Sequence, residues 1–208
     1  ANKSVPTFLF MGNNLKGPLE LVESLGGERV MLGFPYPGGE RDGHIIKSMR
    51  VDEKKKYTLP IGEVDGQVIE RTKKVAELLG SMRGYKVQIR TDMDAWLKYH
   101  VAFMISGLVP ALLASGINMK RLGRTRDLIV LAIRATKEAM AGLEEAGIPP
   151  SPSLLKIFSW IPEPILVYLI GNFMKKEVAK TSIEGHSRAA PDEMKYLFDE
   201  LKILYSKI

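Results

Sequence analysis

The sequence predicts a chain of two unlike parts, an α/β segment followed by an all-helical segment. Up to residue 91, short apolar runs bounded by glycine and proline alternate with amphipathic stretches, which is typical of strands covered by helices. From Asp94 onward, long stretches repeat their apolar residues at helical spacing. We therefore expect an α/β domain over residues 1–91 and a helical domain over residues 92–208.

The expected elements of the α/β part follow one another closely. Residues 7–11 form a continuous apolar run ended by Gly12, which predicts a strand buried on both faces. Residues 18–25 predict a short helix closed by Gly26 and Gly27. The pattern then predicts, in order, a buried strand over 29–34, turns over 35–43, strands over 44–51 and 56–61, a helix over 68–82 and a strand over 85–89.

The helical part is predicted from residues that typically start, kink or end helices. Asp94 suits the N-cap of a helix that runs to residue 115, with a kink at Pro110. A long helix is expected over 126–146 and a last one over 192–205. Residues 157–174 are the most apolar stretch, but two prolines interrupt it. Because a membrane span takes about 20 largely apolar residues, a buried helix pair is the better interpretation.

Composition excludes several classes of function. The 208 residues include no cysteine, which rules out disulfides, thiolate metal sites and cysteine nucleophiles and fits a cytoplasmic location. The three histidines show no metal-ligand spacing, so no metal site is expected. The net charge of +6 is scattered and interleaved with acids, so we expect no nucleic-acid partner. Because the most apolar stretch is interrupted, we expect no membrane partner either. An anionic small molecule suits this charge surplus.

Two familiar phosphate-binding turns do not occur. The sequence contains no G-x-G-x-x-G, the turn that grips the pyrophosphate of a dinucleotide. Gly12 and Gly17 have the spacing of a P-loop, but Pro18 stands where that motif requires lysine. Neither motif therefore predicts a nucleotide-phosphate site in this sequence.

Lys98 is the residue that most suggests chemistry. On a helix it shares one face with four apolar residues, Ala102, Ile105, Val109 and Leu112. Two interpretations stay open. The amine snorkels along the stripe to water, which the spacing alone favours, or it is partly desolvated and serves as a proton donor.

The other candidates have an ordinary structural explanation beside the functional one. Asn13 and Asn14 follow a buried strand, where ligands of open α/β sheets bind, but asparagine also tolerates turn conformations. Glu193 lies in the first turn of the last helix, where the helix dipole favours an acid whatever its role. His100 and His186 are more often hydrogen-bonded structural residues than catalysts.

Several stretches, taken in order, resemble the ketopantoate reductase (2-dehydropantoate 2-reductase) family. They are residues 8–14 with Gly17, residues 30–34 leading into 41–44, residues 94–98, and residues 185–186 with 193–194. The tryptophan-x-lysine formed by Trp96 and Lys98 is the most specific of these elements. The match spans nearly the whole chain.

The resemblance implies a fold, a cofactor and a reaction. Members of that family look like a Rossmann domain followed by a helical domain, with the active site between them. They reduce a 2-keto acid with NADPH in pantothenate biosynthesis. By resemblance, residues 1–91 would be the C-terminal part of the Rossmann-like domain, without the family's glycine-rich turn. The chain by itself would then bind NADP poorly, and a homodimer is expected.

The resemblance also implies roles for four residues. Lys98 would be the general acid that protonates the ketone oxygen, and Asn13 would lie at the nicotinamide and substrate end of the site. Ser182 and Glu193 would bind the substrate, although aligning both requires a one-residue gap. The family commonly has asparagine where this sequence has Ala102, and residues 181–185 lack the Gln-Asp usual after the serine. Since lost hydrogen bonds change which substrate is accepted, a relative with another keto-acid substrate is expected.

A second hypothesis belongs to a different class of function. The chain would be a non-catalytic helical association module that kept the fold and lost the chemistry. Residues 157–174 would then form a dimer seam, although such an apolar stretch is more often core. Basic residues beside Phe173 suggest, more remotely, a role at a membrane surface.

Overall fold

The computed structural model describes residues 4–36, 38–48 and 56–206. The chain divides into two compact units, the first comprising Ala1–Tyr36 and Arg50–Lys98 and the second Pro37–Met49 and Tyr99–Ile208. The division at Lys98 and Tyr99 falls inside a single helix, α3 (Met93–Phe103). Each unit has its own sheet or hairpin and its own buried core.

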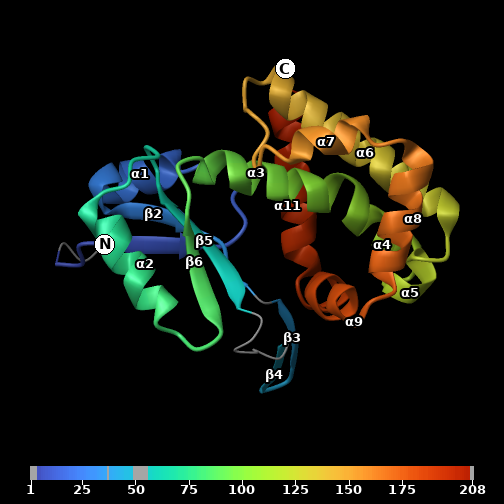
Figure 1. Cartoon of the computed structure of the whole chain (residues 1–208), viewed down its shortest axis with the longest axis horizontal. Coiled ribbons are helices and arrows are strands. Elements are labelled where there is room, and N and C mark those ends of the chain that lie inside the picture. The colour runs from blue at the N-terminus through green and yellow to red at the C-terminus, as the bar shows by residue number, and fades with distance from the viewer. Residues whose placement is uncertain (1–3, 37, 49–55, 207–208) are drawn as a thin grey trace. The chain divides into compact units, whose positions relative to one another are not determined.

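The first unit is built on a four-stranded mixed sheet (Figure 1). Its strands lie in the order β1 (Phe8–Met11), β2 (Val30–Gly33), β5 (Tyr57–Glu63) and β6 (Tyr85–Ile89). β1 pairs with β2 in parallel, with Phe8 opposite Val30, and β5 pairs with β6 in parallel, with Tyr57 opposite Tyr85. β2 and β5 run antiparallel. The carboxyl ends of β1 and β2 therefore meet at one edge of the sheet.

Helices cover this sheet and close its core. α1 (Leu19–Leu25) follows β1, a 3₁₀ turn over Gly27–Arg29 leads into β2, and α2 (Glu70–Gly80) packs beside β6. The Glu63 carboxylate at the end of β5 is buried and accepts a hydrogen bond of 2.7 Å from the Thr72 hydroxyl of α2. A buried carboxylate needs such partners, so this contact fixes α2 on the sheet. The first turns of α3 complete the core, where Met93 and Leu97 pack against Leu32 of β2.

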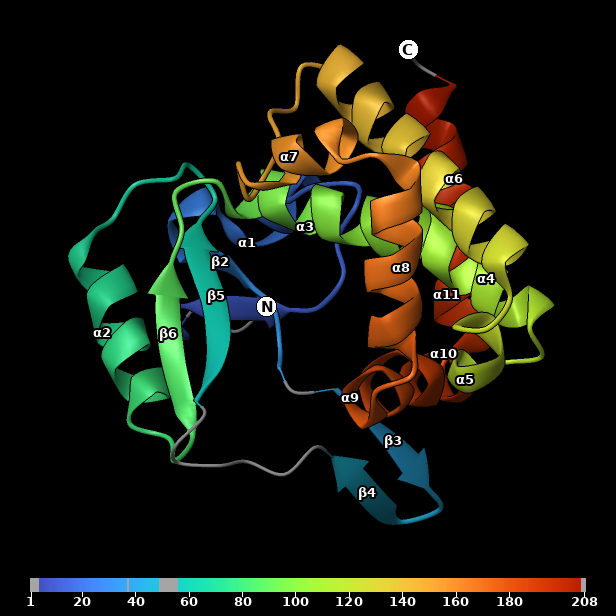
Figure 2. The ribbon, with the colours of Figure 1, turned by 45° about the vertical axis from the view of Figure 1, so that its right-hand side comes forward.

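The second unit is a hairpin and a set of helices (Figure 2). Its elements are the hairpin β3 (Gly39–Asp42) and β4 (Ile45–Ser48), the end of α3, the π-helical segment η2 (Met104–Leu108), α4 (Val109–Ala114), α5 (Met119–Leu122), α6 (Arg126–Glu145), α7 (Leu155–Trp160), α8 (Glu163–Met174), α9 (Glu177–Ala179), the π-helical segment η3 (Lys180–Glu184), α10 (Gly185–Ala189) and α11 (Pro191–Tyr205).

The core of the second unit lies between its longest helices. Leu108 and Leu112 of η2 and α4 pack with Ile129 and Ile133 of α6 and with Leu166 of α8. The run Met93–Ala114 is long and apolar enough to cross a membrane by length and composition, and 61% of its most apolar window is buried inside the protein. A buried core helix passes the same test, so this run is weak evidence for a membrane span.

Several elements confirm the sequence predictions. The strands β2 and β6 and the helices α1, α2, α6 and α11 lie where the pattern predicted them, within a few residues at their ends. The predicted strand over residues 44–51 is β4, and its last positions from residue 49 lie outside the described residues. The predicted fold class, a partial Rossmann-like α/β part followed by a helical part, is confirmed.

Other predictions need correction. β1 is only half-buried along its length, so its burial on both faces was wrong. The stretch over 35–43 contains strand β3 rather than turns alone. The expected kink at Pro110 is instead a wide π-helical turn over Met104–Leu108, directly before the proline. The helix pair over residues 157–174 exists as α7 and α8, but every residue of α7 is at least partly exposed, so a buried pair was wrong.

Gly107 allows η2 to approach α6 closely. A Cβ atom built on Gly107 would overlap the carbonyl oxygen of Ala132 and come within 2.6 Å of the Thr136 hydroxyl. Because the backbone of α6 cannot yield as a flexible side chain does, Gly107→Ala is expected to lower the free energy of unfolding by about 2 to 3 kcal/mol. Denaturant titration measures this loss. The matched change Gly80→Ala, whose Cβ meets only an ordinary contact at 3.9 Å, should leave stability nearly unchanged.

Candidate functional site

The loop after β1 forms the first part of the candidate site. It begins at Gly12, whose amide donates to the Gly33 carbonyl of β2 at 3.3 Å, and it carries Asn13 and Asn14 at the carboxyl end of the strand. The Asn14 side-chain oxygen accepts from the Gly17 amide at 2.9 Å, which closes a tight turn. Asn14 therefore has the structural role that asparagine often takes in turns. Asn13 stays a candidate binding residue.

The first turns of α3 bring a lysine and a carboxylate to this loop. Lys98 Nζ donates to Asp94 Oδ2 one helical turn earlier. A Cβ atom on Gly17, which has φ of +89°, would lie 3.2 Å from Lys98 Nζ and 3.3 Å from Asp94 Oδ1. The absence of a side chain at this position thus lets the backbone of the loop approach the ion pair. Asp94 Oδ1 is buried and has no hydrogen-bond partner among the described residues.

The surroundings of Lys98 test the first of the two interpretations of its apolar face, snorkelling to water. Ala102 and Ile105, on the same face, are buried, as the helical spacing predicted. The Lys98 side chain is only 12% exposed and is paired with a carboxylate, so snorkelling to water was wrong. Trp96 holds the start of the helix on the sheet, because its ring packs 5.4 Å from that of Phe34, just after β2. The amine is therefore held in a largely dry position near the carboxyl ends of β1 and β2.

Ser182 lies in the second unit, in the π-helical segment η3. The hairpin lies close against it, since a Cβ atom on Gly38 would sit 3.0 Å from Ser182 Cα. π-helical turns are rare and are often found at functional sites because they change the direction of individual side chains. The sequence pattern gave no sign of this turn, and the helices α9 and α10 on either side of it were missed as well.

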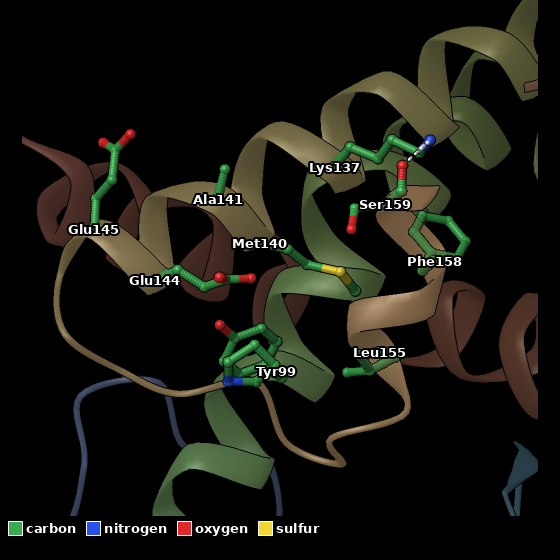
Figure 3. Close-up of a pocket in the computed structure, with 10 residues that line it drawn as sticks. Tyr99, Lys137, Met140, Ala141, Glu144, Glu145, Leu155, Phe158 and Ser159 are labelled. Atoms are coloured by element: carbon green, nitrogen blue, oxygen red, sulfur yellow. Dashed lines mark hydrogen bonds between the residues drawn. The ribbon is translucent and has the colours of Figure 1, made fainter. Parts of the chain in front are cut away.

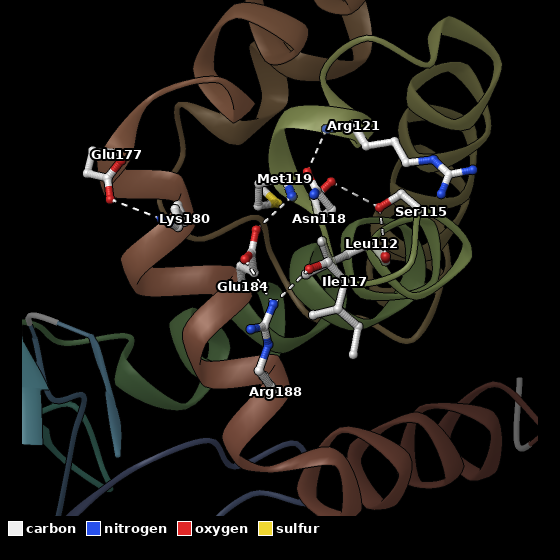
Figure 4. Close-up of polar contacts among 10 residues, drawn as sticks. All are labelled: Leu112, Ser115, Ile117, Asn118, Met119, Arg121, Glu177, Lys180, Glu184 and Arg188. Atoms are coloured by element: carbon white, nitrogen blue, oxygen red, sulfur yellow. Dashed lines mark hydrogen bonds and ion pairs between the residues drawn. The ribbon is translucent and has the colours of Figure 1, made fainter. Parts of the chain in front are cut away.

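Glu184 anchors the segment that carries Ser182 (Figure 4). Its carboxylate accepts from the Met119 amide at the start of α5 at 2.8 Å and from Arg188 at 3.1 Å. Arg188 also donates to the carbonyl of Ile117 at 3.2 Å. Ile117 has φ of +53°, which is an outlier for a β-branched residue. These contacts hold a strained turn and η3 together, so Glu184 positions the Ser182 segment in a way that sequence reasoning missed.

Glu193 and two histidines form a cluster in the second unit. Glu193 lies in the first turn of α11, and its Oε2 is 3.3 Å from Nε2 of His186 on α10. His100 of α3 lies near His186. Burial, and then the positive charge of His186, lower the pKa of His100 from 6.5 to about 4. His100 is therefore neutral at physiological pH, and the cluster can present one carboxylate to a ligand.

A separate pocket of about 370 Å³ lies among α3, α6 and α7 of the second unit (Figure 3). The Tyr99 hydroxyl donates to the Ile148 carbonyl at 3.0 Å, and burial, with the charge of Glu144, raises the pKa of Tyr99 to about 12. Lys137 donates to the carbonyl of Ser159 near the end of α7 at 3.2 Å. This pocket contains none of the four residues predicted for the site.

Among the residues that the structure describes, no group of three or more His, Asp or Glu side chains is placed to hold a metal ion. The predicted site residues form two groups. Lys98 and Asn13 belong to the first unit, and Ser182 and Glu193 belong to the second. Sequence reasoning missed Asp94 as the partner of Lys98, although their four-residue spacing on a helix was an available signal.

The chain has the fold of the ketopantoate reductases. The dimeric ketopantoate reductase of Staphylococcus aureus matches with a TM-score of 0.52 and 13% identity, and an assigned ketopantoate reductase of Ralstonia solanacearum MolK2 matches with 0.55 and 12%. A D-mandelate dehydrogenase in a ternary structure with NADH and anilino(oxo)acetate matches with 0.51 and 12%. Each match covers 97% of this chain and 68% of the other.

These likenesses, at 12–13% identity, show the fold alone. No family model matches the sequence, and no curated protein matches it.

Proposed function

We propose that this chain is part of an NADP-dependent reductase of a small 2-keto acid, acting in the cytoplasm. The observation that supports this most is the Lys98–Asp94 pair, held in a largely dry position near the carboxyl end of a parallel strand. Ligands of open α/β sheets bind at such strand ends. The structural neighbours are described as ketopantoate reductases and as a D-mandelate dehydrogenase in a structure with NADH, which supports a nicotinamide-dependent oxidoreductase in general.

In this proposal Lys98 is the general acid. A nicotinamide cofactor, when bound, supplies the hydride that reaches the carbonyl carbon of the keto acid. The Lys98 ammonium gives one proton from Nζ to the carbonyl oxygen, so that the product is a 2-hydroxy acid and the amine is left neutral. Asp94 keeps the amine in place through its hydrogen bond.

The residues of this chain fit only one end of such a cofactor. Asn13 follows β1 at the edge where a nicotinamide ring would approach Lys98, and we propose it as a cofactor and substrate contact. The sequence contains no glycine-rich turn for the pyrophosphate. We therefore expect the chain alone to bind NADPH weakly.

Ser182 and Glu193 are proposed to bind the substrate. Glu193 suits a substrate hydroxyl or a carbonyl hydrate as a hydrogen-bond acceptor, and its contact with His186 fixes one of its oxygens. Ala102 stands one turn after Lys98, where it can make no side-chain hydrogen bond. A substrate smaller or less polar than ketopantoate is consistent with this loss.

The test compares two acids of the same helical turn. In the complete gene product that carries this chain, Glu193→Gln is expected to raise KM for the keto acid by about 10- to 100-fold, with a smaller effect on kcat. The exposed neighbour Asp192→Asn removes a charge from the same helix N-terminus and should leave both constants nearly unchanged. NADPH consumption with a panel of 2-keto acids measures both. Equal effects of the two changes on KM would mean that Glu193 acts only as a charge at the N-terminus of α11.

A second candidate function is a non-catalytic association module. The exposed apolar residues of α7 and α8 and the replacement by Ala102 favour it. NADPH titration of the complete gene product separates the two candidates. Saturable binding with turnover of any 2-keto acid supports the reductase, and absence of both supports the module.

A further inference from the structure

The pocket among α3, α6 and α7 has walls that are held in place by hydrogen bonds. The Tyr99 hydroxyl ties α3 to the loop at Ile148 at 3.0 Å. Lys137 ties α6 to the end of α7, because its ammonium donates to the carbonyls of Ser159 at 3.2 Å and Ile161 at 3.3 Å (Figure 3). The volume of about 370 Å³ suits a small molecule. A pocket with fixed walls loses little conformational freedom when a ligand binds.

Most of the lining of this pocket is apolar. Met140 and Tyr99 are buried, and Leu155 and Phe158 of α7 are half-buried beside them. Pro150 contributes to the wall from the loop between α6 and α7, and its fixed φ stiffens that loop. Apolar and aromatic walls with a few polar groups are typical of small-molecule sites. The lining therefore suits a ligand with an apolar arm.

One carboxylate is aimed into this pocket. Glu144, near the end of α6, points toward Met140 and Tyr99, whereas the neighbouring Glu145 points away from them (Figure 3). Burial and then the charge of Glu144 raise the pKa of Tyr99, as expected for a carboxylate near the ring. The part of the chain that the structure describes provides no cation paired with Glu144.

The electrostatics at this end of α6 favour a cation. Glu144 and Glu145 both lie in the last turn, where the helix dipole disfavours acids, and that turn contains no basic residue. Lys137 lies two helical turns earlier, about 10 Å along the axis, and its ammonium already donates to two carbonyl oxygens. Among the described residues, the unbalanced charge at the pocket is therefore negative.

We propose that this pocket binds a small organic ammonium ion that carries an aromatic or branched apolar arm. The ammonium group donates to the Glu144 carboxylate, and the arm packs against Leu155 and Phe158. A 2-keto acid carries the opposite charge and does not suit this pocket. The inference is independent of the proposed reductase, because none of the residues assigned to that reaction lines the pocket.

Calorimetric titration of the purified chain with phenethylamine tests the proposal without any measurement of activity. Hydrocinnamate, which has a similar shape and the opposite charge, is the matched ligand. Phenethylamine is expected to bind saturably and at least about tenfold more tightly than hydrocinnamate. Absence of saturable amine binding, or equal affinity for the two compounds, would overturn the proposal.

Two neighbouring acids then locate the binding site. Glu144→Gln is expected to weaken phenethylamine binding by about tenfold, because it removes the charge that faces the ligand. Glu145→Gln removes the same charge from the same helical turn, but its side chain points away from the pocket and affinity should change little (Figure 3). Equal effects of the two changes would show a general attraction to the end of α6 rather than a site at Glu144.

A third variant blocks the pocket without removing a contact of the fold. Ala141 is exposed and lines the pocket three residues before Glu144, so Ala141→Lys supplies an ammonium that pairs with this carboxylate. It should abolish phenethylamine binding and leave the thermal transition at least as high, because a base near the end of a helix suits its dipole. Leu131→Lys adds the same charge at an exposed position of α6 outside the lining and should leave binding intact. Undiminished binding to Ala141→Lys would contradict the assignment.

Discussion

Replacing Lys98 by alanine is expected to lower kcat of the complete gene product by about a thousandfold, in the range that general acids contribute. The physical reason is that no other described ammonium takes part in the Asp94 contact, so the developing alkoxide would have to draw its proton from water. NADPH consumption with the best keto acid measures the loss. Lys74→Ala, which removes an exposed lysine from α2 of the same unit, is the control and should change kcat little.

The Lys98→Ala change also leaves the Asp94 carboxylate without its partner, and an unpaired charge near the core destabilises a fold. The double variant Lys98→Met and Asp94→Asn removes both charges together and separates the two effects. It is expected to fold, as judged by its thermal transition, and to be as inactive as the single variant. Wild-type turnover in a folded Lys98 variant would refute the general-acid assignment.

The second large effect concerns stability in acid. The pKa of His100 is lowered from 6.5 to about 4, first by burial and then by the charge of His186. A group with a lowered pKa binds its proton less readily in the folded than in the unfolded chain, so stability is full above pH 6.5 and falls as the pH drops toward 4. The gap between the two pKa values corresponds to about 3 kcal/mol of unfolding free energy.

Denaturant titrations at neutral pH and near pH 4 measure this effect. His100→Gln should flatten the dependence between those values, because its side chain does not titrate. His44→Gln, in the exposed turn of the β3–β4 hairpin, removes a histidine without that burial and should leave the wild-type dependence in place. An unchanged profile in His100→Gln would mean that other groups govern the acid transition.

The pattern of apolar residues predicted the elements whose form depends on their own sequence. β6 and α6 have strong periodicity and clear end signals, and both lie where they were predicted. β3 was missed because its residues lie in a stretch rich in glycine and proline, and its strand form comes from pairing with β4. The π-helical turns were missed for a similar reason. Their hydrogen bonds depend on packing, such as the contact of Gly107 with α6, rather than on residue type.

The site residues also divide into features that the local sequence predicts and features that depend on packing. The apolar face of Lys98 could be predicted from spacing, but its pairing with Asp94 and its 12% exposure required the structure. Glu184 was treated as a departure from a motif, whereas its two hydrogen bonds give it an anchoring role. The exposure of α8 could not be predicted either, since an apolar stripe has the same sequence whether a core or a partner covers it.

The wide turn at Met104–Leu108 has a consequence for how the chain accommodates changes in length. A residue removed from α3 between Asp94 and Lys98 would turn Lys98 by about 100° around the helix axis relative to Asp94 and the loop at Gly17. A residue removed within Met104–Leu108 can instead convert the π-helical turn to an α-helical one. A single-residue deletion in this helix should therefore be tolerated better at that turn than beside the lysine.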